Sequence, residues 1–155
     1  MYKIRYFSAT NNSKYYAYSL YEVMKKDIED ISYEFIDING EEFKDDVLIL
    51  FFPILYQRLP ISLNTFINNS KFENTLIYVY AGSFDKLGIV LNDLKNALKE
   101  KDVTLASFKM IKSVSAEKYH LFALNYIIMA FRKKTFPHLA RQSSIRSQFT
   151  SRAKS

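Results

Sequence analysis

The hydrophobic positions of this chain fall into short apolar runs that alternate with longer segments of helical periodicity. Apolar runs of about four to eight residues predict strands, whereas apolar residues at three- and four-residue spacing predict helices. The run Val47–Phe52 (VLILFF) is continuously apolar, which is typical of a strand covered on both faces. The predicted strands are Tyr2–Phe7, Ser32–Ile38, Val47–Phe52, Thr75–Tyr80 and Thr104–Met110. The predicted helices are Ser13–Lys26, Asp85–Lys101 and Ala116–Phe131, together with a helix that Pro60 starts. The inner face of that helix would be Leu63, Phe66 and Ile67. A turn or short helix is predicted over Asn39–Asp46.

The alternation of strands and helices predicts the fold class. Right-handed β-α-β crossovers of this length give a parallel sheet with helices on both faces, an α/β three-layer sandwich. For five strands we expect the order 2-1-3-4-5, which puts the alternating strands at the edges and the apolar ones inside. The first strand would be central although Lys3 and Arg5 interrupt it. We expect their aliphatic stems to lie along the sheet and their charges to reach its rim.

Composition sets limits on the class of protein. The 155 residues are 48% hydrophobic and 25% charged, which is ordinary for one globular domain. No cysteine is present, so this chain forms no disulfide, thiolate metal site or cysteine-ligated iron–sulfur cluster. The start of the sequence, MYKIRYF, enters a strand without the features of a signal peptide, and we expect a cytoplasmic protein.

The net charge of +6 is concentrated at the end of the chain. Residues 132–155 hold seven Lys or Arg and no Asp or Glu, whereas residues 1–131 hold 15 basic and 16 acidic residues. We therefore predict a domain over residues 1–134 and a basic, flexible tail over residues 135–155. The tail could contact an acidic partner or a membrane surface. We do not expect nucleic-acid binding, because the domain shows no basic surface with interleaved aromatic residues.

The segment Tyr119–Phe131 is apolar almost all round. Its thirteen residues are too few to cross a bilayer, which needs about twenty. We interpret it as part of a last helix, capped by Ser115, that packs on the sheet, with docking to a partner or membrane as the alternative. The two histidines, His120 and His138, have no neighbours spaced to make a metal site, and nothing indicates a catalytic triad.

The loop after the first strand carries the strongest candidate chemistry. Ser8-Ala9-Thr10-Asn11-Asn12-Ser13 supplies hydroxyls, amides and backbone N–H groups at the start of a helix. Unpaired N–H groups and the helix dipole together favour a phosphate, and neutral donors suit a terminal monophosphate. The alternative is that Ser and Asn only form a turn and cap the helix.

Four segments carry a resemblance to a known family. The segment IRYFSATNNSKYYAYSL resembles the flavodoxin fingerprint, in which a strand ends in a phosphate loop rich in Ser, Thr, Gly and Asn. LFFPILYQRLP is similar to the second loop of the small flavodoxin domains in anaerobe ferredoxin–flavodoxin fusion proteins, and YVYAGSFDKLG and NDLKNALKEKDV resemble the third loop and fourth helix. The resemblance covers about residues 2–112 and implies an FMN-binding protein that transfers electrons.

The resemblance also implies which residues bind the cofactor. Asn11 stands where the family usually has Gly, and Asn accepts a positive φ better than most residues. Tyr56 would stack on the flavin ring, or else pack on the sheet edge. The implied cofactor-binding residues are Ser8, Thr10, Asn11, Asn12 and Ser13 in the first loop, Pro53, Ile54, Leu55 and Tyr56 in the second, and Ala81, Gly82, Ser83 and Phe84 in the third.

Neighbouring residues have open roles. Gly82 would let the backbone approach the ring, and Phe84 or Tyr80 could give a second aromatic wall, although Tyr80 could equally belong to the core. Gln57 and Arg58 stand where relatives commonly have glycine. Arg58 would lie near the pyrimidine side of the flavin and favour its anionic reduced form, or be a solvated surface charge.

Three functions remain open at this point. The first is an electron carrier that exchanges electrons with a separate partner protein, a reductase or ferredoxin, because the cysteine-rich ferredoxin module of many relatives is not in this chain. The second is an FMN-dependent NAD(P)H oxidoreductase that acts on quinones or similar acceptors. The third is a non-redox interaction module that has lost FMN, which the chain's three glycines would suit.

Overall fold

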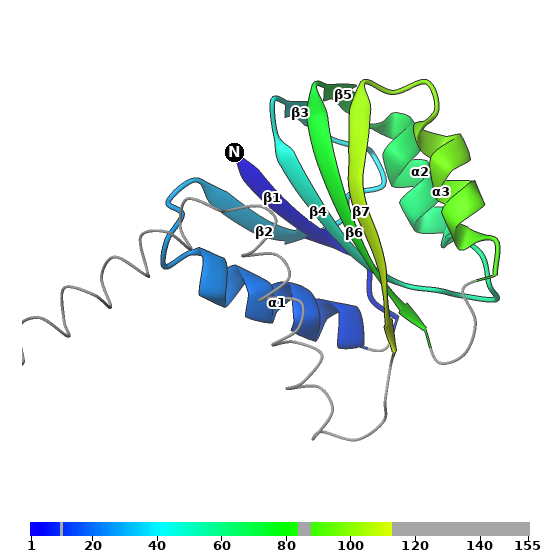
Figure 1. The fold of residues 1–155 in the computed structure, drawn as a ribbon, viewed down its shortest axis with the longest axis horizontal. Coiled ribbons are helices and arrows are strands. Elements are labelled where there is room, and N and C mark those ends of the chain that lie inside the picture. The colour runs from blue at the N-terminus through cyan, green and yellow to red at the C-terminus, as the bar shows by residue number, and fades with distance from the viewer. Residues whose placement is uncertain (10, 84–87, 113–155) are drawn as a thin grey trace, which may run out of the picture. The chain divides into compact units, whose positions relative to one another are not determined.

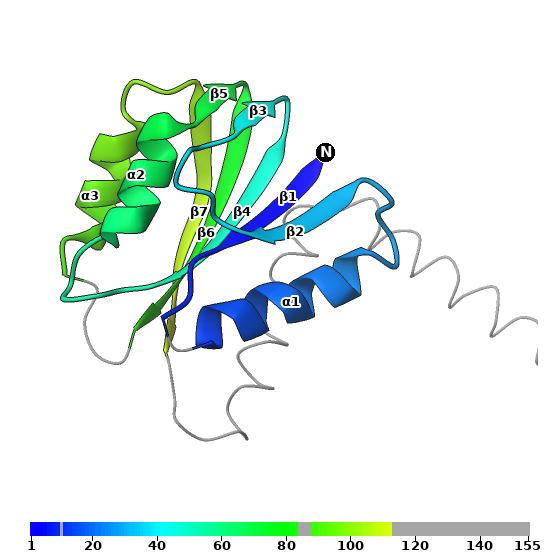
Figure 2. The same cartoon turned by 180° about the vertical axis from the view of Figure 1, so that it is seen from behind.

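The computed structural model describes residues 1–9, 11–83 and 88–112, which form a parallel sheet with helices on both faces (Figure 1). Helix α1 covers one face, and α2 and α3 lie side by side on the other, as the reverse view also shows (Figure 2). The strands are β1 (Tyr2–Tyr6), β2 (Ile31–Phe35), β3 (Glu42–Lys44), β4 (Val47–Pro53), β5 (Lys71–Glu73), β6 (Thr75–Ser83) and β7 (Val103–Lys112). The helices are α1 (Asn12–Met24), α2 (Ile61–Asn69) and α3 (Val90–Leu98).

The five long strands lie in the order β2-β1-β4-β6-β7, and every neighbouring pair is parallel. Counted along the main sheet, this is the predicted order 2-1-3-4-5, so the predicted three-layer α/β fold is confirmed. The order reverses between β1 and β4, where Tyr6 lies opposite Phe51. Phe51 in turn lies opposite Tyr80 of β6. This register brings the carboxyl ends of the three central strands to one edge of the sheet.

The core explains the continuously apolar run in β4. Leu48, Leu50 and Phe52 belong to the buried cluster between the sheet and α2 and α3. Ile49 and Phe51 alternate with them and are also buried, so both faces of β4 are covered. The predicted inner face of α2 is confirmed: the helix residues Leu63, Phe66 and Ile67 are each at most 1% exposed.

The segment after β2 differs from the prediction. We expected a turn or short helix over Asn39–Asp46, but its middle is the strand β3, which pairs in parallel with β5. The sequence did not indicate β5, because three residues are too few to show a pattern. Phe43 of β3 is 2% exposed and stacks on Phe72 of β5, with ring centroids 5.1 Å apart. This ring pair buries an apolar face that a turn would leave in water.

Several boundaries also differ. β2 ends at Phe35 rather than Ile38, and β6 continues through Ser83, so part of the expected third loop is strand. Helix α3 begins at Val90 rather than Asp85, after a turn in which Gly88 has a φ of 59°. The predicted last helix, its cap and the predicted tail lie outside the described residues.

The charges of β1 are paired rather than placed at the rim. Arg5 is only 4% exposed, and its Nε and Nη2 donate to the two carboxylate oxygens of Glu41 over 2.7 and 2.9 Å. The Lys3 Nζ lies 3.0 Å from the Asp46 Oδ2 and 4.7 Å from the centroid of the Phe43 ring. The expectation that the charges reach the rim is therefore wrong for Arg5. The β3 segment supplies the carboxylates that let a central strand carry two cations.

Glu41 and Glu42 allow a matched test of this pairing. Substitution E41Q removes the less exposed carboxylate of Arg5 and leaves Glu34, which is 62% exposed and lies 3.4 Å from the Arg5 Nη2. We expect a loss of about 3 kcal/mol in the free energy of unfolding. E42Q removes an ion pair with Lys71 in which both side chains are at least 76% exposed, so its stability should stay close to that of the wild type. Urea unfolding compares the two variants. Equal losses would contradict the burial argument.

Asp46 should make stability depend on pH at the acid end. Burial alone would raise the pKa of Asp46, but the Lys3 ammonium, the Lys44 backbone N–H and the N-terminal ammonium together hold this pKa below its usual value. A lowered folded pKa stabilises the native state above the ordinary Asp value of about 3.9 and loses that effect as the pH falls through the folded value.

We therefore expect D46N to be less stable than the wild type by about 2 kcal/mol at pH 7. The difference should shrink towards zero as the pH falls below about 3.9. Urea unfolding at several pH values measures it. A difference that stays constant across this range would show that the carboxylate charge of Asp46 does not contribute.

Candidate functional site

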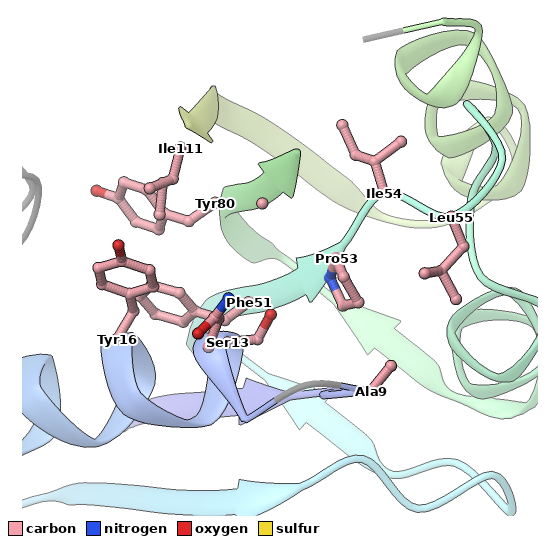
Figure 3. Close-up of a pocket in the computed structure, with 11 residues that line it drawn as sticks. Ala9, Ser13, Tyr16, Phe51, Pro53, Ile54, Leu55, Tyr80 and Ile111 are labelled. Atoms are coloured by element: carbon pink, nitrogen blue, oxygen red, sulfur yellow. The ribbon is translucent and has the colours of Figure 1, made fainter. Parts of the chain in front are cut away.

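A cavity of about 100 Å³ opens where the carboxyl ends of β1, β4 and β6 meet the first turn of α1 (Figure 3). It lies at the point where the strand order reverses, which is where open parallel sheets bind ligands. The cavity therefore brings together segments of all three loops that the sequence singled out. Its lining residues are Ala9, Asn12, Ser13, Tyr16, Phe51, Pro53, Ile54, Leu55, Tyr80, Gly82 and Ile111.

The turn between β1 and α1 is set by one left-handed residue. Asn11 has a φ of 62° and a ψ of −8°, the conformation for which Gly is otherwise preferred. Its carbonyl accepts the first helical hydrogen bond, from the Tyr15 N–H at 2.9 Å. Its side chain makes no capping hydrogen bond, and the first turn of α1 contains no acidic residue. The start of α1 thus keeps its positive dipole end uncompensated by a carboxylate.

Two serines flank this turn. Ser13 is 7% exposed and lines the cavity. The Ser8 Oγ is buried and has no hydrogen-bond partner among the residues that the structure describes. A buried hydroxyl without a partner costs about 1–3 kcal/mol, so such groups are rare in native proteins. Ser8 is not among the residues that line the cavity. An anion bound at this turn is one group that could accept from the Ser8 hydroxyl.

The second loop forms a tight turn beside the cavity. Ile54 and Leu55 line the cavity, and the Ile54 N–H donates to the Gly82 carbonyl over 2.7 Å. Tyr56 and Gln57 then both take a positive φ, of 51° and 59°. Tyr56 is 97% exposed and does not line the cavity. The alternative that Tyr56 packs on the sheet edge is therefore wrong.

Arg58 closes the same turn and pairs with Asp93 of α3. Its Nε lies 2.7 Å from the Asp93 carboxylate, and the Arg58 side chain is 62% exposed. The hydrogen bond from Arg58 holds the pKa of Asp93 below its usual value. Arg58 is thus an exposed, ion-paired side chain that does not line the cavity.

The aromatic wall of the cavity comes from Tyr80, Phe51 and Tyr16. Tyr80 and Phe51 stack with ring centroids 5.0 Å apart and planes 18° apart. Tyr80 is 3% exposed, so it is both core and cavity wall. Burial raises the pKa of Tyr80 to about 12 and also raises the pKa of Tyr16, so both hydroxyls stay neutral near pH 7. Figure 3 shows both rings on the same side of the cavity as Ile111.

Only some of the predicted site residues line the cavity. Those that line the cavity are Asn12, Ser13, Pro53, Ile54, Leu55 and Gly82. Ala81 instead faces the core between the sheet and α2 and α3, and Ser83 is buried without lining the cavity. Thr10 and Phe84 lie outside the described residues.

Sequence reasoning missed four lining residues, namely Ala9, Tyr16, Phe51 and Ile111. Tyr16 stands three positions after Ser13, so helical spacing could have placed it on the same face of α1. Phe51 and Tyr80 could be paired only once the register between β4 and β6 was known. Ile111 lies near the end of β7, and no local signal in the sequence marks it.

The lining is electrically neutral. None of the lining residues carries a formal charge, so binding of an anion would depend on N–H groups, hydroxyls and the α1 dipole. Across residues 1–9, 11–83 and 88–112, no group of three or more His, Cys, Asp or Glu could hold a metal ion. Within the same ranges, no helix is both long enough and apolar enough to cross a membrane.

A parallel five-stranded sheet with helices on both faces and a cavity at its reversal point defines a doubly wound α/β protein. No family model and no curated protein matches the sequence. Among solved structures, the chain is similar to oxidised flavodoxin 2 from Bacillus cereus, with a TM-score of 0.62 and 13% identity over 86% of this chain and 98% of that chain. The fold is therefore flavodoxin-like.

Two further structures show the same likeness. Two-electron reduced Megasphaera elsdenii flavodoxin matches with a TM-score of 0.59 and 15% identity over 80% of this chain and 95% of that chain. The Trp repressor binding protein from Bacillus subtilis matches with a TM-score of 0.55 and 11% identity over 83% of this chain and 95% of that chain. Identities this low establish the fold alone, so any function must be argued from the site.

Gly82, which lines the cavity, and Gly88, which lies against Gln57, differ in what they tolerate. A Cβ on Gly82 would meet only the Phe52 carbonyl oxygen at 3.9 Å, so G82A should leave stability unchanged or raise it by up to about 1 kcal/mol. A Cβ on Gly88 would lie 2.2 Å from the Gln57 Cβ at a φ of 59°. We therefore expect G88A to cost about 2 kcal/mol or more. Thermal unfolding compares them, and a tolerated G88A would refute the close contact with Gln57.

Proposed function

We propose that this site binds FMN and that the protein carries electrons to or from a separate partner protein. The observation that carries the proposal is the uncapped start of α1, where the buried Ser13 lines the cavity. The Ser8 hydroxyl, in the loop that leads into this helix, is buried without a described partner. These are the groups that a terminal phosphate requires. The flavodoxin structures with the same fold support the choice of phosphate ligand.

The phosphate would be held by neutral donors. Backbone N–H groups at Asn12 and Ser13 and the hydroxyls of Ser8 and Ser13 would donate to its oxygens. The α1 dipole would favour the negative charge, and no carboxylate of the first turn opposes it. A cofactor with a terminal phosphate therefore fits this end of the cavity.

The flavin ring would lie at the open end. A volume of about 100 Å³ is below the roughly 300 Å³ of a pocket that encloses a drug-sized ligand, so the ring would extend out along Ile54 and Leu55 towards Tyr56. Apolar walls exclude water there, and an aromatic side chain would cover one face of the ring. FMN, when bound, supplies the electron-transfer chemistry, and the chain binds and orients it.

The proposal predicts that purified protein absorbs as a flavoprotein and binds one FMN per chain. Steady oxidation of NAD(P)H without a partner protein would favour the oxidoreductase alternative. A colourless protein that does not bind added FMN would contradict the proposal and favour the interaction module, which the fold shared with the Trp repressor binding protein leaves open.

The hydroxyls of the turn can be tested directly. The double substitution S8A/S13A removes two donors of charge-assisted hydrogen bonds, each worth about 1.5–3 kcal/mol. We therefore expect FMN to bind at least about a hundredfold more weakly. S19A, which removes a hydroxyl from the same helix away from the cavity lining, is the control and should bind normally. Fluorescence titration measures both, and equal affinities would refute the phosphate assignment.

A further inference from the structure

The Tyr56–Gln57 turn is held in a conformation that its residues disfavour. Both residues have a positive φ, although neither is glycine. Leu55 and Arg58 on either side form an antiparallel bridge, and the Arg58 N–H donates to the Leu55 carbonyl over 2.9 Å. This is the geometry of a two-residue turn of the type that normally selects Asn or Gly. Something outside the turn must therefore stabilise it.

Burial of Tyr56 does not provide that stabilisation. The side chain of this residue is 97% exposed, and Gln57 is exposed as well. Strained residues persist where surrounding structure fixes them, often at ligand sites. The constraint therefore comes from contacts that Gln57 and the residues after it make outside the turn.

Those contacts converge on the start of α3. The Asp93 carboxylate accepts three hydrogen bonds: from the Arg58 Nε at 2.7 Å, from the Arg58 Nη2 at 3.2 Å and from the Leu59 backbone N–H at 3.2 Å. The Gln57 carbonyl accepts from the Ile89 N–H at 3.1 Å. The Asp93 side chain is only 18% exposed, against 62% for Arg58.

We propose that Asp93 is a positioning residue that locks the Tyr56–Gln57 turn and so presents the Tyr56 ring to the flavin. This inference rests on the proposed function. Asp93 does not touch the cavity; it acts through Arg58 and Leu59. Because Leu55 lines the cavity and Tyr56 follows it directly, a locked turn keeps an aromatic face at the rim of the site. Ordering this loop in advance reduces the entropy cost of binding.

The effect of Asp93 on the mobility of the Tyr56–Gln57 turn can be measured without any ligand. The chain contains no tryptophan, so Y56W creates a single fluorescent tryptophan at the tip of the turn. In the Y56W background we expect D93N to lower the fluorescence anisotropy of Trp at position 56. R58M, which removes the same ion pair from the other side, should do the same. E42Q removes an exposed ion pair elsewhere and should leave the anisotropy unchanged.

The second readout uses FMN with Tyr56 intact. D93N and R58M should each weaken FMN binding about fivefold and leave the bound flavin fluorescence less quenched than in the wild type. Unchanged anisotropy and unchanged quenching in both variants, as in E42Q, would overturn the role of Asp93. Failure of the wild-type chain to bind FMN would instead overturn the proposed function, and it would be seen before any substitution is made.

Discussion

The candidate site depends on one backbone constraint, the left-handed conformation of Asn11. The chain must leave β1 and begin α1 within a few residues, and a positive φ at Asn11 makes that reversal. The helix then starts with its N–H groups beside the cavity, and helical spacing places Ser13 and Tyr16 on the same wall. An Asn can meet this requirement without Gly because its short polar side chain tolerates the left-handed region. A chain with three glycines can therefore still build the turn.

The ion pairs of the central strand and of the second loop add no charge to the lining of the cavity. Arg5 and Lys3 of the central strand are paired with Glu41 and Asp46, which stand on either side of β3 in the sequence, and Arg58 is paired with Asp93. None of these charges lines the cavity. Selectivity for an anion would then come from dipoles and hydroxyls that are fixed in place, which cost little reorganisation on binding. The same ion pairs fix the elements that border the site, so the electrostatics of the scaffold and the geometry of the site are linked.

Much of the fold could be predicted because the central strands of a doubly wound sheet are buried on both faces and are therefore almost entirely apolar in sequence. The continuous apolar run of β4 indicated a central strand, and the strand order placed the first loop at the point of reversal. The second and third loops were implied by the resemblance to flavodoxins. Contacts between distant segments could not be predicted. The strand β3 is extended because Phe43 stacks on Phe72, and the exposure of Tyr56 depends on the turn that Arg58 and Asp93 hold. Neither pairing has a local signal.

The most direct test of the account is to compare the binding of FMN and riboflavin to the same protein by isothermal titration calorimetry. The two ligands share the ring and the ribityl chain and differ in the terminal phosphate. If the first turn of α1 holds that phosphate, FMN should bind at least about a hundredfold more tightly than riboflavin, because several charge-assisted hydrogen bonds are lost without it. Equal affinities for the two ligands would contradict the account, since they would show that the turn at Asn11 holds no anion.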